Sequence, residues 1–524
     1  MTDFSGGAAI ANYVLGTDIG TYSSKGVLVN SADGAVITEH VIEHDLSMPK
    51  SGWAEHDAEA IWWGEFAAIS RALVEKSGVS AQNIRGVGVS GIGNCVLPID
   101  ADGNALRAGI LYGIDTRASA ETAALEQTLG RERIFETSAT HLSSSAAGPK
   151  ILWIKNHEPE VFAKARWFMN SHSYVIYKLT GEATVDIYTA GGYAPLIDVM
   201  QRKWHPPAAE AIVPIKKLPT ILPSSAIAGR VTKEAAQITG LAQGTPVVAG
   251  AIDAGAEAIG AGVQQAGDMM IMLGSSNSLI LITDKLTRTE NFWGLNWIKP
   301  GEYAVVGGMS TVGSLTRWFR DHFSPQELTQ EAQGGMNAYA SLAKLLDKSP
   351  PGANGLVALP YFEGERTPFY DPNAKGMLAG LNLKHTRADV YRALLESVGF
   401  GIRHNLESLA AEGLNPQRFI VIGGGTRNTE WLQIISDIAS IALLVPEKQI
   451  GSAYGDAIMA AAGTGLLADL GQSSKWIAFS HTITPRAAHK ALYDALYNIY
   501  RALYTSSADL MKAISKIQQK GNRV

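Results

Sequence analysis

The stretch Tyr13-Val14-Leu15-Gly16-Thr17-Asp18-Ile19-Gly20-Thr21-Tyr22-Ser23-Ser24-Lys25-Gly26-Val27-Leu28-Val29 decides the fold of this chain. Two short apolar runs, 13–15 and 26–29, lie on either side of a polar turn. Short apolar runs bounded by turn residues are typical of adjacent strands. The turn between them carries one carboxylate, glycines, hydroxyl groups and one ammonium group. We therefore predict a hairpin whose turn can bind a ligand.

The residue types in this turn suit the phosphate tail of a nucleotide. Glycines let the backbone approach closely, and N–H and hydroxyl groups donate to phosphate oxygens. Lys25 adds a positive charge. Asp18 could hold a hydrated Mg²⁺, which prefers one or two carboxylates together with phosphate oxygens. An ordinary tight hairpin, whose Asp and Ser side chains bond to their own backbone, is the alternative.

Length and composition indicate an ordinary globular protein with more than one domain. The chain has 524 residues, of which 46% are hydrophobic and 18% are charged. A net charge of −5 argues against a nucleic-acid surface or an anchor to an anionic membrane. No apolar run approaches the roughly 20 residues that a membrane helix needs.

Two further features favour a cytoplasmic protein. The first twelve residues lack a basic start and an apolar core, so we expect a disordered leader rather than a signal peptide. Cys95 is the single cysteine, which excludes a disulfide within the chain and fits a reducing compartment.

The first half of the chain has the order of an α/β unit. A third strand is predicted over 36–44, followed by a helix that Asp57 caps and Gly78 ends. Residues 84–90 then form a buried strand that runs into Gly91-Ile92-Gly93-Asn94-Cys95. Three strands, a helix and a fourth strand is the order of a ribonuclease-H-like unit.

The middle of the chain is expected to be helical over 117–181, with loops at the proline-rich segments that follow, among them Pro206-Pro207. The α/β pattern restarts at Gly244. We therefore predict an N-terminal domain over 1–248 and a C-terminal domain over 249–524.

The second half of the chain repeats the strand–turn–strand pattern of the first. A strand over 267–273 runs into Gly274-Ser275-Ser276-Asn277-Ser278, and a second strand follows over 279–283. Later, a strand over 419–422 runs into Gly423-Gly424-Gly425, followed by a helix over 430–442. Two related halves, each with a turn suited to phosphate, predict a duplicated fold with a nucleotide in the cleft between them.

Two long amphipathic helices complete the prediction. One covers 388–411 and stops at Gly413. The other occupies the last forty residues, with an apolar stripe predicted at Leu492, Leu496, Ile499 and Leu503. Both are interpreted as packing helices.

Taken together, these motifs resemble the FGGY family of carbohydrate kinases. Residues 18–25 resemble its first phosphate motif, and Gly274-Ser275-Ser276 its second. The segments 364–368 and 376–396 are similar to the C-terminal signature, closest to that of xylulokinases, and Gly423-Gly424-Gly425 with Asn428 resembles the adenosine motif. The ordered set spans about 13 to 465 and is highly specific.

The resemblance implies two actin-like (ribonuclease-H-like) α/β domains that close over ATP and a small sugar or polyol. It places the catalytic base at Asp253, which follows an apolar strand beside Ala254, Gly255 and Ala256. A sugar hydroxyl must lose its proton as it attacks the γ-phosphoryl group, so a carboxylate is needed there. From the residues alone, Asp253 could instead cap the following helix.

The resemblance also assigns residues to ATP and Mg²⁺. Asp18 is expected to hold Mg²⁺ through water. Arg317 could equally be a structural ion-pair partner. The residues expected near ATP are Thr21, Ser23, Lys25, Gly274, Ser275, Ser276, Gly313, Arg317, Gly424 and Asn428.

The sequence says less about the substrate. The family contacts its sugar after the fourth strand, here at Gly93 and Asn94, where glycerol kinases carry Arg-Glu and xylulokinases Met-His. The residue after the base, Ala254, also departs from the usual Asn or Gln. Asp115 and Arg117 match a family element near the sugar, with a buried ion pair as the alternative.

We therefore expect an ATP-dependent kinase for a ketose or polyol, with D-xylulose or a related pentulose favoured. Ribulose, gluconate, erythritol and glycerol are alternatives within the class. A silent sugar-binding regulator on the same fold is a further alternative, and a mechanical ATPase is disfavoured because no segment is left for a filament or peptide partner. A homodimer is possible, and neither nucleic acid nor membrane is expected as a partner.

Overall fold

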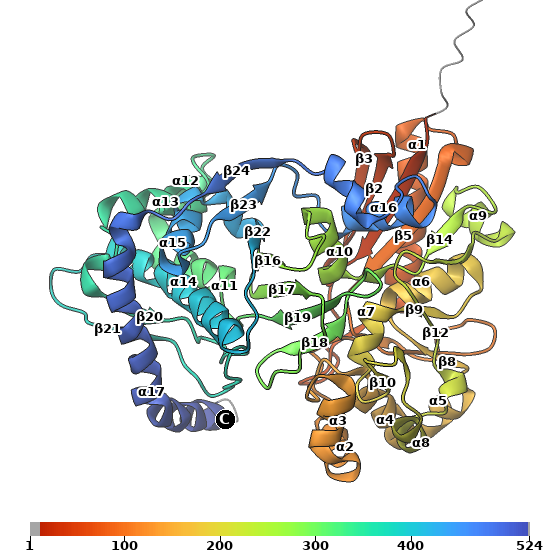
Figure 1. The fold of residues 1–524 in the computed structure, drawn as a ribbon, viewed down its shortest axis with the longest axis horizontal. Helices are drawn as coiled ribbons and strands as arrows, with labels where there is room; N and C mark the ends of the chain where they lie inside the picture. Colours follow the sequence, from red (N-terminus) through yellow and green to blue (C-terminus); the bar gives the residue numbers. More distant parts are fainter. Residues whose placement is uncertain (1–10, 522–524) are drawn as a thin grey trace, which may run out of the picture. The chain divides into compact units, whose positions relative to one another are not determined.

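The computed structural model describes residues 11–521, which form two compact units, each built around a mixed β-sheet (Figure 1). Unit 1 comprises the described residues up to Ala266 together with Ile282–Ala304 and Ile450–Ala478. Unit 2 comprises Gly267–Leu281, Val305–Gln449 and the described residues from Phe479. Residues 1–10, most of the predicted leader, lie outside the described part. The boundary predicted at 248/249 stays a prediction.

The main sheet of unit 1 begins with the predicted hairpin. Strands β1 and β2 pair antiparallel, so that Asp18 lies opposite Lys25, and β1 pairs parallel with β5. The sheet has the order β13-β14-β5-β1-β2-β3, and β15 also pairs with β5. Its strands are β1 (Tyr13–Ile19), β2 (Ser23–Asn30), β3 (Val36–Glu43), β5 (Ile84–Gly91), β13 (Ile227–Arg230), β14 (Pro246–Val248) and β15 (Ala251–Ile252).

Helix α16 (Ser452–Gly463) packs directly on β1 and β5 although it comes late in the sequence. Glycines make this close contact possible. A Cβ on Gly16 would lie 1.9 Å from the carbonyl oxygen of Ala453, and one on Gly88 would lie 2.1 Å from that of Asp456. Only glycine therefore fits at these two strand positions, because any side chain would push the helix off the sheet.

Helix α1 packs against β2 and β3 of this sheet, whereas α2, α5 and α8 pack against α4 around a second core. As predicted, Asp57 caps the first helical segment and Gly78 ends α1. The helices are α1 (Phe66–Ser77), α2 (Ser119–Leu125), α3 (Arg131–Ser138), α4 (Ala147–His157), α5 (Pro159–Lys164), α6 (Ser171–Thr180), α7 (Ile187–Ala190), α8 (Pro206–Ile212), α9 (Lys233–Thr239), α10 (Asp253–Ala261) and α16. The short strands are β4 (Glu55–His56), β6 (Leu97–Ile99), β7 (Gly109–Ile110), β8 (Trp167–Met169), β9 (Thr184–Asp186), β10 (Ile197–Asp198), β11 (Lys203–Trp204), β12 (Thr220–Leu222) and β18 (Trp293–Asn296).

The sheet of unit 2 repeats the strand order of unit 1, which confirms the predicted duplication. Its order is β18-β19-β17-β16-β22-β23-β24, in which β18 is an additional edge strand, with β16 antiparallel to β17 and parallel to β22. Its strands include β16 (Asp268–Leu273), β17 (Asn277–Thr283), β19 (Tyr303–Gly307), β22 (Arg418–Ile422), β23 (Leu443–Pro446) and β24 (Phe479–Ile483). Strands β20 (Val357–Leu359) and β21 (Met377–Ala379) form a separate antiparallel pair. Its helices are α11 (Gly313–Phe323), α12 (Pro325–Ala332), α13 (Ala338–Ala343), α14 (Arg387–Ala411), α15 (Thr429–Ala439) and α17 (Lys490–Gly521).

The structure corrects two sequence predictions. Pro206 and Pro207 begin helix α8 instead of lying in a loop, because proline fits the first turn, where its missing N–H is not needed. In α17, Leu492 and Ile499 of the predicted stripe are exposed, and a row of tyrosines packs inward instead. These tyrosines bury their rings and bond through their hydroxyls, as Tyr493 does to Glu396. No helix among residues 11–521 is long and apolar enough to cross a membrane.

Candidate active site

The turn between β1 and β2 is tight. The N–H of Gly20 donates to the carbonyl oxygen of Ser23 over 2.9 Å. Thr21 and Ser23 are half-buried beside it. Lys25 forms a 2.9 Å ion pair with Glu39 on β3. The turn thus presents hydroxyls and backbone N–H groups beside a carboxylate, as the sequence predicted.

A buried histidine, which the sequence analysis missed, supports this turn from behind. The ring of His56 bonds through Nε2 to the carbonyl oxygen of Thr21 over 3.1 Å, and its Nδ1 accepts the indole N–H of Trp62 over 3.2 Å. Burial lowers the pKa of His56 to about 4, so the ring stays neutral. The hydroxyls of Tyr112 and Thr21 lie 3.2 Å apart.

Asp18, which is half-buried, belongs to a hydrogen-bonded group that α16 completes with the buried Asp456. The hydroxyl of Ser90 lies 3.0 Å from Oδ1 of Asp18 and 2.6 Å from Oδ2 of Asp456. Burial raises the pKa of Asp18 to about 6 and that of Asp456 well above its usual range. Asp456 lies in the sequence far beyond the motifs of the first half, so sequence reasoning missed it.

Asp253 is the first residue of α10, directly after β15. Its Oδ1 accepts the N–H of Ala254 over 2.7 Å. Burial, and then the negative charge of Asp18, raise the pKa of Asp253 to about 8. One turn later, burial and the charge of Asp18 raise the pKa of Glu257 to about 7. The fold therefore gathers these three carboxyl groups into one electrostatically coupled site in unit 1.

The loop after β5 presents an amide oxygen without a partner. Oδ1 of Asn94 is buried and accepts no hydrogen bond within the described residues. A Cβ on Gly192 would lie 1.6 Å from Nδ2 of Asn94, so this amide needs a glycine opposite it. Cys95 is fully buried, and burial raises the pKa of its thiol, which makes it an unreactive packing residue.

Asp115 and Arg117 form a buried ion pair. Nη2 of Arg117 lies 2.7 Å from Oδ2 of Asp115, and its Nη1 bonds to Glu55 over 2.8 Å. Both side chains are fully buried, and the guanidinium lies 3.9 Å from the centre of the Trp53 ring. Oδ2 of Asp115 also accepts the N–H of Ala54. The ion-pair alternative of the sequence analysis is thus the arrangement seen here.

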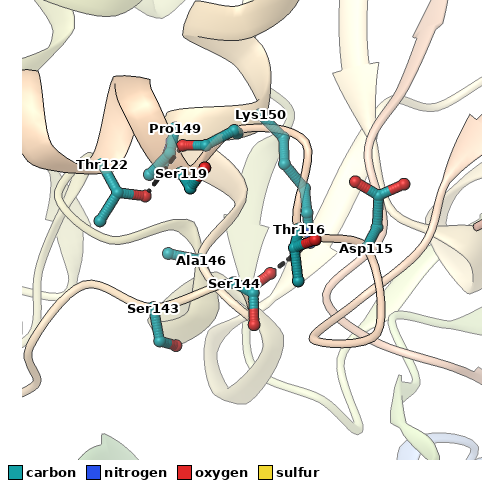
Figure 2. A pocket seen from close by; sticks show the side chains of 10 residues that line it. Asp115, Thr116, Ser119, Thr122, Ser143, Ser144, Ala146, Pro149 and Lys150 are labelled. Atoms are coloured by element: carbon teal, nitrogen blue, oxygen red, sulfur yellow. Dashed lines mark hydrogen bonds between the residues drawn. The ribbon is translucent and has the colours of Figure 1, made fainter. Parts of the chain in front are cut away.

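A pocket of about 170 Å³ lies beside Asp115 in unit 1 (Figure 2). Serine and threonine side chains line it, together with the stem of Lys150. The ammonium of Lys150 donates to the carbonyl oxygens of Ser144 and Tyr112, over 2.6 and 3.0 Å. Lys150 therefore ties the segment that carries Tyr112 to the loop that precedes α4.

In unit 2, the Gly274-Ser275-Ser276 turn connects β16 and β17 and is bound to the start of α11. The N–H of Gly313 donates to the carbonyl oxygen of Gly274 over 2.9 Å, and that of Ser314 donates to Ser275 over 3.0 Å. A Cβ on Gly313 would lie 2.5 Å from the carbonyl oxygen of Gly274. Gly313 thus lets the helix start against the turn.

The segment 364–368 of the C-terminal signature holds this turn in place. Nη2 of Arg366 donates to the carbonyl oxygens of Asn277 and Met309, over 2.9 and 2.8 Å. Oε1 of Glu365 accepts the N–H of Ser310 over 2.8 Å. The sequence analysis identified the signature by resemblance only; in the structure, its Glu365 and Arg366 side chains bond to the backbone around the turn.

The other predicted nucleotide residues also lie in unit 2. Arg317 on α11 is 71% exposed and pairs with Asp321 over 3.6 Å. A Cβ on Gly424 would touch nothing, so the surface above this glycine is open. Asn428 caps α15 by accepting the N–H of Trp431 over 3.1 Å. The binding roles of these residues, and the cleft predicted between the domains, stay predictions.

Comparison with known proteins gives consistent matches over almost the whole chain. The models for the N-terminal and C-terminal domains of the FGGY family of carbohydrate kinases match residues 13–260 and 269–464. A xylulose kinase of Bacillus subtilis is 29% identical over 97% of this chain and 99% of its own length. A gluconokinase of Bacillus licheniformis is 27% identical, over 97% and 99%. The crystal structure of a xylulose kinase from Rhodospirillum rubrum superposes with a TM-score of 0.87 at 32% identity, over 95% of this chain and all of that one.

Proposed function

Because this chain belongs to the FGGY family of carbohydrate kinases, and so is a phosphotransferase with two actin-like domains, we propose that it transfers the γ-phosphoryl group of ATP to a hydroxyl of a ketose. D-xylulose or a related pentulose is the favoured substrate, since relatives named xylulose kinase match both the sequence and the fold.

The observation that carries this proposal is the placement of Asp253. It begins a helix in the same coupled carboxyl site as Asp18, and its raised pKa suits a group that must take up a proton. We assign it the role of general base, which accepts the proton of the attacking sugar hydroxyl. A base of this kind contributes roughly 10²–10⁴ in rate.

We propose that Asp18 holds Mg²⁺ through water. After burial, the negative charge of Asp18 raises the pKa of both Asp253 and Glu257, so a cation beside Asp18 would be stabilised. Mg²⁺ usually keeps several of its waters and takes only one or two carboxylates from the protein, so Asp18 would hold it through water. When bound, the ion neutralises charge on the phosphate oxygens.

The remaining site residues keep their predicted roles as proposals. Thr21, Ser23 and Lys25 would donate to phosphate oxygens in unit 1. The unit 2 residues proposed for ATP are Gly274, Ser275, Ser276, Gly313, Arg317, Gly424 and Asn428.

Gly93 and Asn94 stay the proposed sugar contacts. Gly93 lets the loop pack on Ile252, since a Cβ on it would lie 2.1 Å from Cγ2 of Ile252, and Asn94 would offer its unpaired amide oxygen to a hydroxyl. We propose that Asp115 and Arg117 act on the substrate indirectly, by fixing the segment that carries Tyr112. Gluconate is the second candidate substrate, because a gluconokinase is also among the full-length relatives.

A coupled assay of ADP release over pentuloses, hexuloses, polyols and aldonates tests the proposal. We expect turnover with a pentulose, and Asp253→Asn should lower kcat by about 10²–10⁴ while ATP and sugar binding persist. Asp284→Asn, at an exposed aspartate outside this site, is the matched control and should keep most activity. Near-normal turnover of Asp253→Asn would contradict the assignment, and sugar binding without any turnover would favour a silent regulator.

A further inference from the structure

A chain of fully buried polar side chains connects the two segments that frame the proposed sugar site. Isolated polar groups are costly to bury, and a completely bonded network in a core fixes one arrangement of its surroundings. The chain starts beneath the loop that carries Asn94 and ends at the residue before Asp253. Its members, all 0% exposed, are Asn170, His172, Asp186 and Thr189.

At one end, the network forms hydrogen bonds to the loop that carries Asn94, on both sides of that residue. Oδ1 of Asn170 accepts the N–H of Cys95 over 2.6 Å. The hydroxyl of Ser171 donates to the carbonyl oxygen of Ile92 over 2.7 Å. Asn94 lies between these two anchored residues, so its amide is held where the N-terminus of α6 places it.

The centre of the network is a histidine whose proton position follows from its neighbours. Since Oδ1 of Asn170 accepts from Cys95, its Nδ2 is the donor toward Nδ1 of His172, 3.0 Å away. Nδ1 of His172 is therefore an acceptor, and Nε2 carries the hydrogen that is donated to Oδ2 of Asp186 over 3.1 Å.

At the other end, the network reaches the proposed base. Oδ1 of Asp186 accepts the N–H groups of Tyr188 and Thr189, each over 3.0 Å, and so caps α7. The hydroxyl of Thr189 then accepts the N–H of Ile252 over 3.1 Å. Asp253 is the next residue, so its backbone is fixed through α7.

We propose that His172 is a positioning residue that sets the sugar loop, and with it Asn94, relative to Asp253. The inference rests on the proposed function but adds a residue to which no catalytic or binding role has been given. His172 touches neither reacting group; it acts through Asn170 on one side and Asp186 on the other. A displacement of about 1 Å at such a site can lower the rate by roughly 10²-fold.

Two substitutions at this position separate positioning from mere packing. His172→Leu removes both hydrogen bonds, whereas the amide nitrogen of His172→Gln can take the place of Nε2 and still donate to Asp186. We expect His172→Leu to lower kcat by about 10–100-fold and to raise the KM for sugar, with the Kd for ATP nearly unchanged. His172→Gln should restore most of the activity.

Ile154→Ala is the control, because Ile154 is a fully buried residue of α4 outside the network. It should lower thermal stability without changing kcat or the KM for sugar at 25 °C. If His172→Leu does not fold, Asp186→Asn replaces it: the new amide keeps an acceptor for α7 but opposes the N–H of His172 with a second donor.

Unchanged sugar kinetics in His172→Leu or Asp186→Asn, or a His172→Gln variant no better than His172→Leu, would overturn the inference. A wrong kinase assignment would give a different result, because the unsubstituted protein itself would then phosphorylate no sugar.

Discussion

Ser90 Oγ lies 2.6 Å from Oδ2 of Asp456, a residue 366 positions away in the sequence. The same hydroxyl also lies 3.0 Å from Oδ1 of Asp18. A serine hydroxyl has one hydrogen and cannot donate to two carboxylates at once, so one of these carboxyl groups must itself carry a proton. We expect Asp456 to be the protonated one, because burial raises its pKa well above the usual range. It would then donate to Ser90, which in turn donates to Asp18.

Asp456→Asn should therefore be tolerated, since its amide can donate to Ser90 as the protonated acid does. Asp456→Ala leaves Ser90 without that bond in a buried site and should lower the free energy of unfolding by about 1–3 kcal/mol, with a loss of kcat. Urea unfolding and sugar-kinase assays of both variants test this. Equal damage in the two would mean that a negative charge at Asp456 is required.

The pH dependence of catalysis should reflect Asp253. With a pKa raised to about 8, this carboxyl group is mostly protonated at neutral pH and cannot accept the hydroxyl proton. We expect kcat/KM for the sugar to rise tenfold per pH unit up to about pH 8 and then to level off. The rising limb should be lost in Asp253→Asn. A limb centred near pH 4 would show that the base behaves as an ordinary exposed carboxylate.

Stability should depend on pH in the opposite direction. The pKa of Asp253 is raised from 3.8 to about 8 on folding, so its contribution to stability is full below pH 4 and is lost as pH rises through 8. The asparagine of Asp253→Asn does not ionise, so this variant does not lose stability as the pH rises. The variant should thus unfold at a higher temperature than the unsubstituted protein at pH 8.5 but not at pH 4. Thermal denaturation followed by circular dichroism measures the difference, and a gap independent of pH would contradict the prediction.

Arg366 should affect both the free energy of unfolding and the KM for ATP. Arg366→Met leaves the carbonyl oxygens of Asn277 and Met309 without this donor, which should cost about 2–4 kcal/mol in unfolding free energy. The turn at 274–276 would loosen, so the KM for ATP should rise. Arg403→Met, which removes a partly exposed surface arginine of α14, is the comparison. An unchanged KM for ATP in Arg366→Met would show that the segment 364–368 does not position the turn at 274–276 for ATP.

The correction to α17 can be tested with two alanine variants. Leu496 is 6% exposed and Ile499 is 51% exposed. Leu496→Ala should lower the free energy of unfolding by about 2–5 kcal/mol, and Ile499→Ala by no more than about 0.5 kcal/mol. Similar losses of unfolding free energy in both variants would mean that Ile499 is buried, as the sequence analysis predicted.

Features with a local cause were predictable from the sequence. The hairpin around Asp18, the cap at Asp57 and the stop at Gly78 each depend on residues a few positions apart. The second turn, at 274–276, follows the same local rules, and so the duplicated strand order could be predicted. The stripe of α17 could not, because helical spacing gives candidate faces and only the neighbouring elements decide which one is buried.

By itself, the sequence determined the two phosphate-type turns, the duplication and the family, since each depends on short stretches read in order. Only the tertiary structure decided the surroundings of the chemistry: the hydrogen bond between Ser90 and Asp456, and the one between His172 and Asp186. The physical reason is burial. A carboxyl or imidazole group changes its protonation and its role when folding removes water and brings distant side chains into contact, and no local pattern records which side chains those are.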